Sequence, residues 1–199
     1  MAVLATTELE AVNVMLSVIT EAPVTTLGVD TIEDASVALT LLREVSRQFQ
    51  AEGWHFNIDY DYELTVDGNN KIPVPTTAAA VDSMDYEDVN VARRGGFLWD
   101  KDNNTFVFSS RQALKCVITW MYDFEDLPQT ARTYITLMAA RRFAKNVMGD
   151  EASVMYTAED ERTARAQFIA DDCRKADYNM LTYSNTVNRA VRRRSPWPV

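Results

Sequence analysis

The stretch QAEGWHFNIDYDYEL, residues 50–64, marks the point at which the hydrophobic pattern of this chain changes. Up to Phe49, apolar residues recur at steps of three and four, which is typical of a helix with one buried face. From Trp54 to Ile58, apolar and polar residues alternate, which is typical of a strand with one buried face. Gly53 stands between the two patterns and is favoured just after a helix end. We therefore expect a helix to end here and a strand to begin.

Two helices are expected before Gly53. An apolar stripe extends from Thr7 to about Thr20, and Pro23 and Gly28 then interrupt the pattern. A second helix is expected to start after Asp30 or Thr31, with a capping box formed by Glu33 or Asp34. The residues predicted to form its buried face are Ala38, Leu41, Val45 and Phe49.

Two more helices are expected after residue 122. Pro128 falls in the first turn of one helix, where its missing N–H costs nothing, and Gly149 ends it. A capping box of Thr157 with Asp160 predicts the start of the last helix. The predicted buried residues are Ile135, Ala139, Phe143 and Val147 in the first, and Ile169, Cys173, Ala176 and Met180 in the second.

Between these helices, short strand-like runs alternate with turn signals. Asp67-Gly68, RRGG at 93–96 and KDNN at 101–104 are the turn signals. TTAAAVDSM at 76–84 leaves a loop and a helical turn both open. The runs predicted as strands after it are YEDVNVA, FLWD, TFVFS and KCVITWMY. They predict a small antiparallel sheet.

The predicted fold class is therefore α+β, with a helical core of about four helices and an inserted small antiparallel β-sheet domain. The expected division is residues 1–53 for the N-terminal helices, 54–122 for the β-rich insertion and 123–181 for the C-terminal helices. Residues 182–199 lose periodicity and are expected to form an extended arm.

The composition indicates a soluble protein with a substantial core. The chain has 199 residues, 47% of them hydrophobic, and a formal net charge of −9. An acidic surface repels nucleic-acid phosphates, so a sequence-reading DNA-binding protein is not expected. Cys116 and Cys173 form no CxxC pair and are expected to be reduced thiols in a protein made in a reducing cytoplasm. We expect neither a signal peptide nor a segment of the roughly 20 apolar residues that span a bilayer.

No motif in the chain specifies a reaction. His55 is the only histidine, so a catalytic triad would have to use it, but no GxSxG motif is present. One histidine and two distant cysteines do not give metal-ligand spacing. RRGG lacks the spacing of a phosphate-binding loop. We therefore predict no catalytic, metal-binding or cofactor-binding residues, and no enzyme.

Acidic pairs leave a polysaccharide-degrading glycoside hydrolase open as the alternative. Such an enzyme needs two carboxyl groups on opposite sides of the sugar. The candidate pairs are Asp59 with Asp61, Asp85 with Glu87 and Asp88, and Glu159 with Glu161. The aromatic residues that would form a sugar platform are Trp54, Phe56, Trp99 and Trp120, although on alternating strands such residues more often form sheet core.

One basic cluster stands near the end of this acidic chain. It consists of Arg189, Arg192, Arg193 and Arg194, without interleaved aromatic residues. Guanidinium groups bind phosphates, but they pair equally well with carboxylates of another protein. The absence of a second basic cluster in the sequence favours an acidic groove on a protein partner.

Several segments together carry a family resemblance. The most distinctive is LLREVSRQFQAEGWHFN at 41–57, which ends in a Gly-Trp-x-Phe-Asn pattern formed by Gly53, Trp54, Phe56 and Asn57. The others are ELEAVNVMLSVITEAPVTTL at 8–27, ARRGGFLWD at 92–100, DFEDLPQTARTYITLMAARRFAKNVMGD at 123–150, EDERTARAQFIADD at 159–172 and YNML at 178–181. In this combination they resemble the tail tubular protein A family, the head-to-tail adaptors of short-tailed, podovirus-type bacteriophages. Residues 65–90 and those beyond 181 match poorly.

The resemblance implies a structural virion protein. Proteins of this family form a twelve-subunit ring below the portal protein, join it to the nozzle protein (tail tubular protein B) and line the genome ejection channel. Tail fibres or tailspikes attach near that junction. Double-stranded DNA contacts the protein only while it passes through the channel, and no membrane is bound. The implied location is the virion tail, after synthesis and assembly in the host cytoplasm, and the free protein can be monomeric.

Two segments are expected to carry this role. The arm with Arg189, Arg192, Arg193 and Arg194 would dock against the portal, and Gly53, Trp54, Phe56 and Asn57 would form the joint between the second helix and the inserted sheet. His55 is expected at the surface or in a hydrogen bond. A tail-associated glycoside hydrolase using an acidic pair, and a DNA-binding module using the terminal arginines, remain the alternatives.

Overall fold

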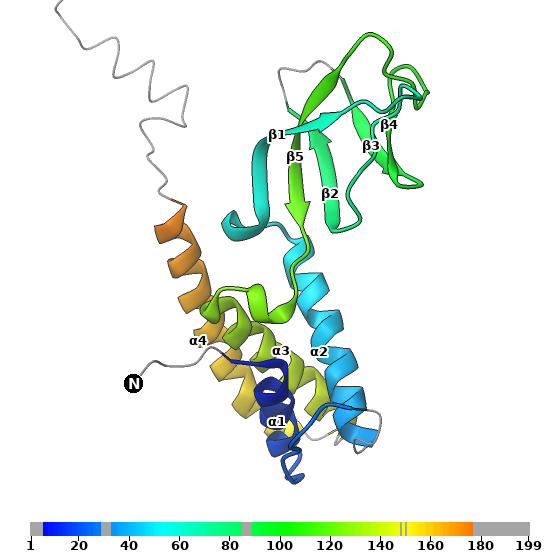
Figure 1. The fold of residues 1–199 in the computed structure, drawn as a ribbon. Coiled ribbons are helices and arrows are strands. Elements are labelled where there is room, and N and C mark those ends of the chain that lie inside the picture. Colours follow the sequence, from blue (N-terminus) through cyan, green and yellow to red (C-terminus); the bar gives the residue numbers. More distant parts are fainter. Residues whose placement is uncertain (1–5, 29–32, 85–88, 148, 150, 177–199) are drawn as a thin grey trace, which may run out of the picture.

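The computed structural model describes residues 6–28, 33–84, 89–147, 149 and 151–176. Figure 1 shows two parts, one above the other: a group of helices, here called the helical body, and a group of strands, here called the β region. The chain passes between them twice, after helix α2 on the way up and after strand β5 on the way down. The α+β fold class and the insertion of the sheet between helices are confirmed.

Helices α1 (Glu8–Val18) and α2 (Glu33–Ala51) form the first half of the helical body. Thr7 caps α1 through a capping box with Glu10, which supplies partners for backbone N–H groups at the helix start. On α2 the buried leucine is Leu42, whereas the predicted Leu41 is only partly buried. Residues 29–32 lie outside the described residues, so the expected start near Thr31 is not described.

Helices α3 (Gln129–Val147) and α4 (Glu151–Lys175) complete the helical body. The predicted face of α3 is confirmed for Ile135, Ala139 and Phe143, but Val147 is 48% exposed in the last turn. The prediction that α4 begins at Thr157 is wrong, because the helix already starts at Glu151.

The predicted buried face of α4 is also wrong. Ala164 and Phe168 are buried, whereas Ile169 is 39% exposed and Cys173 is exposed. Phe168 contacts the rings of Phe49, Trp54 and Phe56, so this aromatic contact determines which side of α4 faces inward. Met180 lies outside the described residues.

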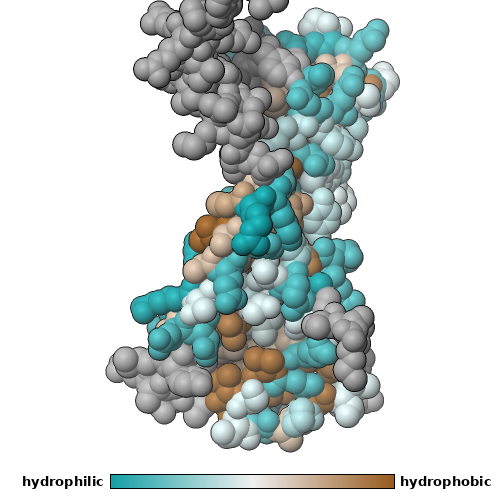
Figure 2. Space-filling model, turned by 90° about the vertical axis from the view of Figure 1, so that its left-hand side faces the viewer, coloured by the Kyte–Doolittle hydropathy of each residue, from teal (hydrophilic) through white to brown (hydrophobic). Residues whose placement is uncertain are grey.

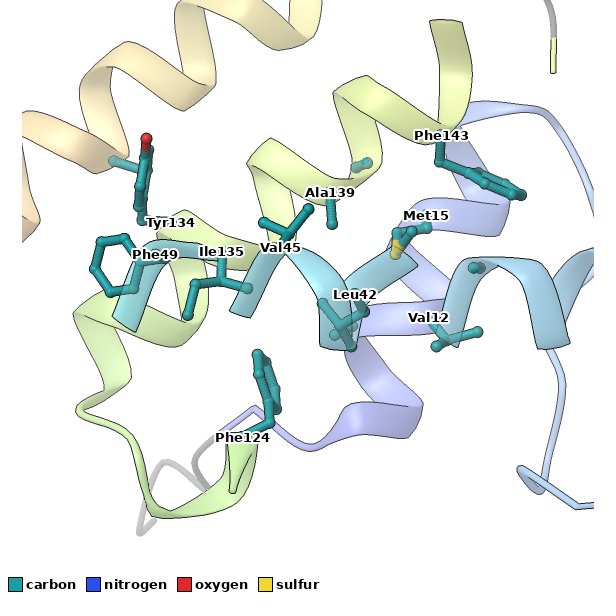
Figure 3. Packing of buried hydrophobic residues seen from close by; sticks show 14 of the residues in the cluster. Val12, Met15, Leu42, Val45, Phe49, Phe124, Tyr134, Ile135, Ala139 and Phe143 are labelled. Atoms are coloured by element: carbon teal, nitrogen blue, oxygen red, sulfur yellow. The ribbon is translucent and has the colours of Figure 1, made fainter. Parts of the chain in front are cut away.

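The core of the helical body lies between α1, α2 and α3, with α4 packed against α3. Figure 3 shows side chains from α1, α2, α3 and the short segment before α3 pointing toward one another. Those labelled are Val12, Met15, Leu42, Val45, Phe49, Phe124, Tyr134, Ile135, Ala139 and Phe143. Small residues on α3, such as Ala139, let the neighbouring helices approach closely.

The β region contains a three-stranded antiparallel sheet and a separate hairpin. The sheet has the order β1-β5-β2, formed by Ile58–Thr65, Ala113–Trp120 and Ala78–Ser83. The hairpin pairs β3 (Val91–Arg94) with β4 (Phe97–Asp100). Its turn uses Gly95 and Gly96 at φ 56° and 82°, a conformation that two-residue hairpins require and glycine adopts without strain. The predicted RRGG turn is thereby confirmed.

Three predictions within the β region need correction. The strand starts at Ile58, because His55–Asn57 form a 3₁₀ turn, η1, that turns Trp54 and Phe56 toward the helical core. The ambiguous run at 76–84 contains strand β2. TFVFS forms a single bridge, Asp100 with Thr105, and no named strand.

The β region has its own hydrophobic core. Leu98 and Val91 of the hairpin belong to one buried cluster with Leu114, Cys116 and Ile118 of β5. This core shares no buried residue with that of the helical body. The two parts of the molecule are therefore packed around separate centres.

Candidate functional site

Buried hydrogen bonds converge at the joint between the helical body and the β region. Two chain segments cross it, one from α2 through η1 to β1 and one from β5 to η3 (Phe124–Asp126). Both crossings are irregular backbone, whose N–H and C=O groups need partners when they are buried. Two buried amide side chains supply them.

Gln50, in the last turn of α2, holds the descending segment. Its side-chain oxygen accepts the backbone N–H of Tyr122 at 2.8 Å, and its side-chain nitrogen donates to the carbonyl of Tyr122 at 3.0 Å. The same nitrogen donates to Ser46 Oγ at 3.1 Å. Gln50 is 1% exposed, so these hydrogen bonds have no competition from water.

Asn57, at the end of η1, connects both crossings. Its side-chain nitrogen donates to the carbonyls of Gln50 and Trp120, both at 2.9 Å. Its oxygen accepts the backbone N–H of Trp54 at 2.8 Å. Asn57 is 1% exposed, and three backbone groups from α2, β5 and the α2–η1 link meet at its amide.

Aromatic packing surrounds this amide pair. Trp54 stacks on Phe49, with ring centroids 5.1 Å apart, and meets Phe168 edge-on at 4.8 Å. Its indole N–H donates to the carbonyl of Phe49 at 2.8 Å, which satisfies a C=O near the end of α2. Phe56 lies on the same cluster, 6.5 Å from Phe49 between centroids. Both predicted aromatic residues therefore pack into the helical body.

Gly53 is required at the turn between α2 and η1. Its φ is +77°, and a Cβ there would lie 3.2 Å from Cδ1 of Ile58. A side chain would therefore both strain the backbone and press on the first residue of β1. His55 is exposed, and its backbone N–H lies 3.4 Å from an Asp172 oxygen.

A groove of about 710 Å³ opens beside the joint, between α2, the β5–η3 segment and the loop before β2. Arg43 and Glu8, which both line the groove, form a bidentate ion pair. Arg43 Nε donates to Glu8 Oε1 at 2.9 Å, and Arg43 Nη2 donates to Glu8 Oε2 at 2.8 Å. The hydrogen bond to Glu8 raises the pKa of the Arg43 guanidinium, and Asp123 adds to the effect. Burial, followed by the Asp59 carboxylate, raises the pKa of Tyr122. The groove has charges of both signs, unlike the predominantly apolar pockets that hold most small ligands.

The acidic pairs that lie in the described residues make surface contacts. Asp59 accepts the indole N–H of Trp120 at 2.7 Å, and Asp61 lies 3.6 Å from Lys115. Both carboxylates are exposed, whereas a glycosidase acid is placed in an apolar environment. Glu161 pairs with Arg141 at 2.9 Å, and 85–88 lie outside the described residues.

The predictions on the basic arm, on metal sites and on membrane spans can be compared with the structure only in its described residues. The terminal arginines, Arg189, Arg192, Arg193 and Arg194, lie outside the described residues. Within the described ranges, no three potential metal ligands come together. No helix in the described part of the chain is long and apolar enough to cross a bilayer.

Sequence patterns did not predict the second half of the joint. Gln50 and Ser46 are polar positions on the inner side of α2, one turn apart, whereas Trp120 ends strand β5 and Tyr122 follows it, far away in the sequence. The one signal in the sequence was Gln50, a polar residue next to Phe49 at the end of an apolar helix face. The fold brings these residues to Asn57, and sequence spacing does not reveal that contact.

A class of protein follows from this geometry: an α+β protein with two separately packed parts and a hydrogen-bonded joint between them. The model of one protein family, described as Tail tubular protein, matches residues 9–178. No curated protein matches the chain. The chain therefore belongs to the tail tubular protein family and is a structural component of a bacteriophage tail.

Proposed function

We propose that this tail tubular protein is a ring-forming head-to-tail adaptor. Twelve copies would form a ring that joins the portal to the nozzle protein and lines the channel for genome ejection. The observation that carries the proposal is the two-part structure of a family member, with two cores joined through hydrogen bonds of Gln50 and Asn57. A ring closes only if every copy presents its contact faces at the same angle.

The helical body has surface suited to contacts between copies. On the face shown in Figure 2, hydrophobic residues gather on the helical body, while the upper, β-region end is mostly hydrophilic or intermediate. Exposed apolar side chains on the described helices are Val14, Val37, Val147 and Ile169. Exposed apolar groups that gather into patches mark interaction surfaces. The faces of α3 and α4 would be buried partly within and partly between copies.

The remaining parts of the proposal follow the family resemblance. The arm with Arg189, Arg192, Arg193 and Arg194 would dock against the portal through its guanidinium groups. An acidic channel wall would let the genome pass, because it makes no phosphate contacts that hold DNA. Tail fibres or tailspikes would attach near the nozzle, and the protein would be made and assembled in the host cytoplasm.

Light scattering on a sizing column, with and without the phage's portal ring, tests the adaptor role. Twelve copies of 22.5 kDa add about 270 kDa to the portal complex. Deletion of residues 186–199 is expected to abolish loading while the thermal unfolding transition of the protein stays unchanged. An unchanged portal mass with well-folded, full-length protein would contradict the adaptor role, and normal loading of the deletion variant would contradict the arm's part alone.

A further inference from the structure

One side of the β region has a group of cations and aromatic rings that the joint does not use. We call it the cation–aromatic patch; it comprises Lys71, Arg94, Phe97, Trp99 and Phe106. The Arg94 guanidinium carbon lies 4.7 Å from the centre of the Trp99 ring. Trp99 meets Phe106 edge-on at 4.6 Å, and the Lys71 ammonium lies 5.5 and 5.6 Å from the Phe97 and Phe106 rings.

The pairing of β3 with β4 turns this patch outward. Residues alternate between the two faces of a hairpin, and Leu98 and Val91 occupy the inner face. Arg94 opposite Phe97, and Ala92 opposite Trp99, therefore occupy the outer face. Arg94 is exposed, and the rings of Phe97 and Trp99 are half-buried. Arginine and aromatic residues in this arrangement are the side chains most enriched at protein interfaces.

The opposite side of the β region has a complementary surface. Strand β1 is an edge of the three-stranded sheet, and we call its exposed run Asp59, Tyr60, Asp61, Tyr62 and Glu63 the acidic edge. Tyr60 is 61% exposed. The pairing with β5 shifts register between Asp59 and Tyr62, and Asp61 has φ 58°, so the strand bulges there. A bulged, charged edge disfavours strand-to-strand pairing but leaves side chains available for docking.

Figure 1 shows β1 on the left of the β region and the β3–β4 hairpin on the right. The sheet order β1-β5-β2, with the hairpin beyond β2, agrees with this placement. We propose that the cation–aromatic patch of one copy docks onto the acidic edge of the next copy around the ring. Contacts between two different faces on opposite sides of a subunit are the kind that closes a ring by rotation.

The chemistry of the two surfaces supports this pairing over other partners. Lys71 and Arg94 oppose three carboxylates, so charge fixes the orientation, while Tyr60 and Tyr62 meet Trp99 and Phe106 and give the contact its apolar area. The inference rests on the proposed ring and adds the contact that closes it. A sugar or a DNA strand would also fit an aromatic surface with cations, but neither accounts for the acidic edge on the other side.

Charge reversal tests the contact in the full-length protein. Lys71→Glu with Arg94→Glu reverses the patch, and Glu63→Lys reverses one of the three carboxylates of the edge, at the position opposite Lys115 in the β1–β5 pairing. Each variant is expected to lower the mass loaded onto the portal by about tenfold, since like charges then face each other. The chain that combines all three changes is expected to recover loading.

Matched controls keep the test decisive. Arg47→Glu makes a single positive-to-negative reversal on an exposed residue of α2, outside both β-region surfaces and outside α3 and α4, and is expected to load normally. Tyr60→Ser removes an exposed ring of the acidic edge without reversing a charge, and it is expected to weaken loading. It tests the edge even where the Glu63 variant does not fold. Thermal unfolding verifies the fold of each variant.

The outcomes separate the contact from the ring itself. If the unaltered protein adds no mass to the portal, both the proposed ring and the proposed contact are contradicted. If the unaltered protein loads and the reversed variants load equally well, only the contact is overturned. Loss of loading in the separate variants without recovery in the combined chain would assign the two surfaces to different partners and overturn the pairing as well.

Discussion

The helical body and the β region keep their shapes by different means. The helical body buries a continuous set of large side chains from three helices, and its aromatic cluster joins α2, α3 and α4 through Phe49, Tyr134 and Phe168. The β region buries fewer residues, and its hairpin and loops depend on backbone hydrogen bonds such as Leu98 N–H to Ile72 C=O at 2.9 Å. The helical body therefore depends mainly on apolar burial, whereas the β region combines a smaller hydrophobic core with strand pairing and turns.

The most damaging change to the helical body is predicted at Phe49. Phe49→Ala removes a ring that contacts Trp54, Phe56, Tyr134 and Phe168, and it is expected to lower the free energy of unfolding by about 3–5 kcal/mol. Chemical denaturation measures the loss. The control Tyr60→Ala, at an exposed ring, is expected to change it by less than about 0.5 kcal/mol. Comparable effects of both changes would contradict the description of this core.

Leu98→Ala tests the core of the β region. Leu98 is fully buried in the core of the β region, and its truncation is expected to cost about 2–5 kcal/mol. Because the two cores share no buried residue, amide hydrogen exchange is expected to quicken in β1–β5 and stay slow in α1–α3. Equal acceleration in both parts would show that they unfold as one unit.

Asn57→Ala tests the joint that links the two parts. The change leaves the carbonyls of Gln50 and Trp120 and the N–H of Trp54 without their partner, at a cost of roughly 1–3 kcal/mol. We expect proteolytic cleavage near residues 52–58 and 120–123 to become faster while both cores remain folded. Asn146→Ala, at an exposed position on α3, serves as the control. Unchanged cleavage would mean that the amide does not hold the joint.

The smallest effect is predicted at Asp100, in the turn after β4. Burial alone would raise the pKa of its carboxyl, but hydrogen bonds from Asn103 and from the Asp102 N–H lower it below the ordinary value. A lowered folded-state pKa stabilises the fold above the unfolded value of about 3.9, and this is lost as pH falls through the folded pKa.

The thermal midpoint of Asp100→Asn, compared with that of the unaltered protein, measures this effect. The difference between the two midpoints is expected to shrink as pH falls from about 7 through the lowered folded-state pKa, because the native carboxyl then becomes protonated as well. A gap that does not change with pH would contradict the role of the ionised carboxylate. Glu125→Gln, at an exposed carboxyl of η3 away from this turn, is the control.

Local signals in the sequence predicted much of the helical body. The apolar stripes of α1 and α3 each recur within one element, and Gly53 and Gly95-Gly96 act on backbone conformation alone. The α+β class and the insertion of strands between helices followed from them. These signals need no knowledge of tertiary contacts.

Long-range contacts determined what the sequence did not predict. Trp54 and Phe56 alternate as in a strand, yet the aromatic cluster with Phe168 turns them toward the helices. Strand β2, with three successive alanines, has weak strand propensity and forms because β5 offers it a pairing edge. The amide of Asn57 joins residues far apart in the chain, so its partners could not be predicted from spacing.

Electron microscopy of the protein assembled on its portal ring tests the central claim most directly. The account predicts a closed ring of twelve copies, each with its β region at one fixed angle to its helical body and in contact with both neighbouring β regions. Particles without a closed ring, or with β regions at variable angles and out of contact, would contradict it.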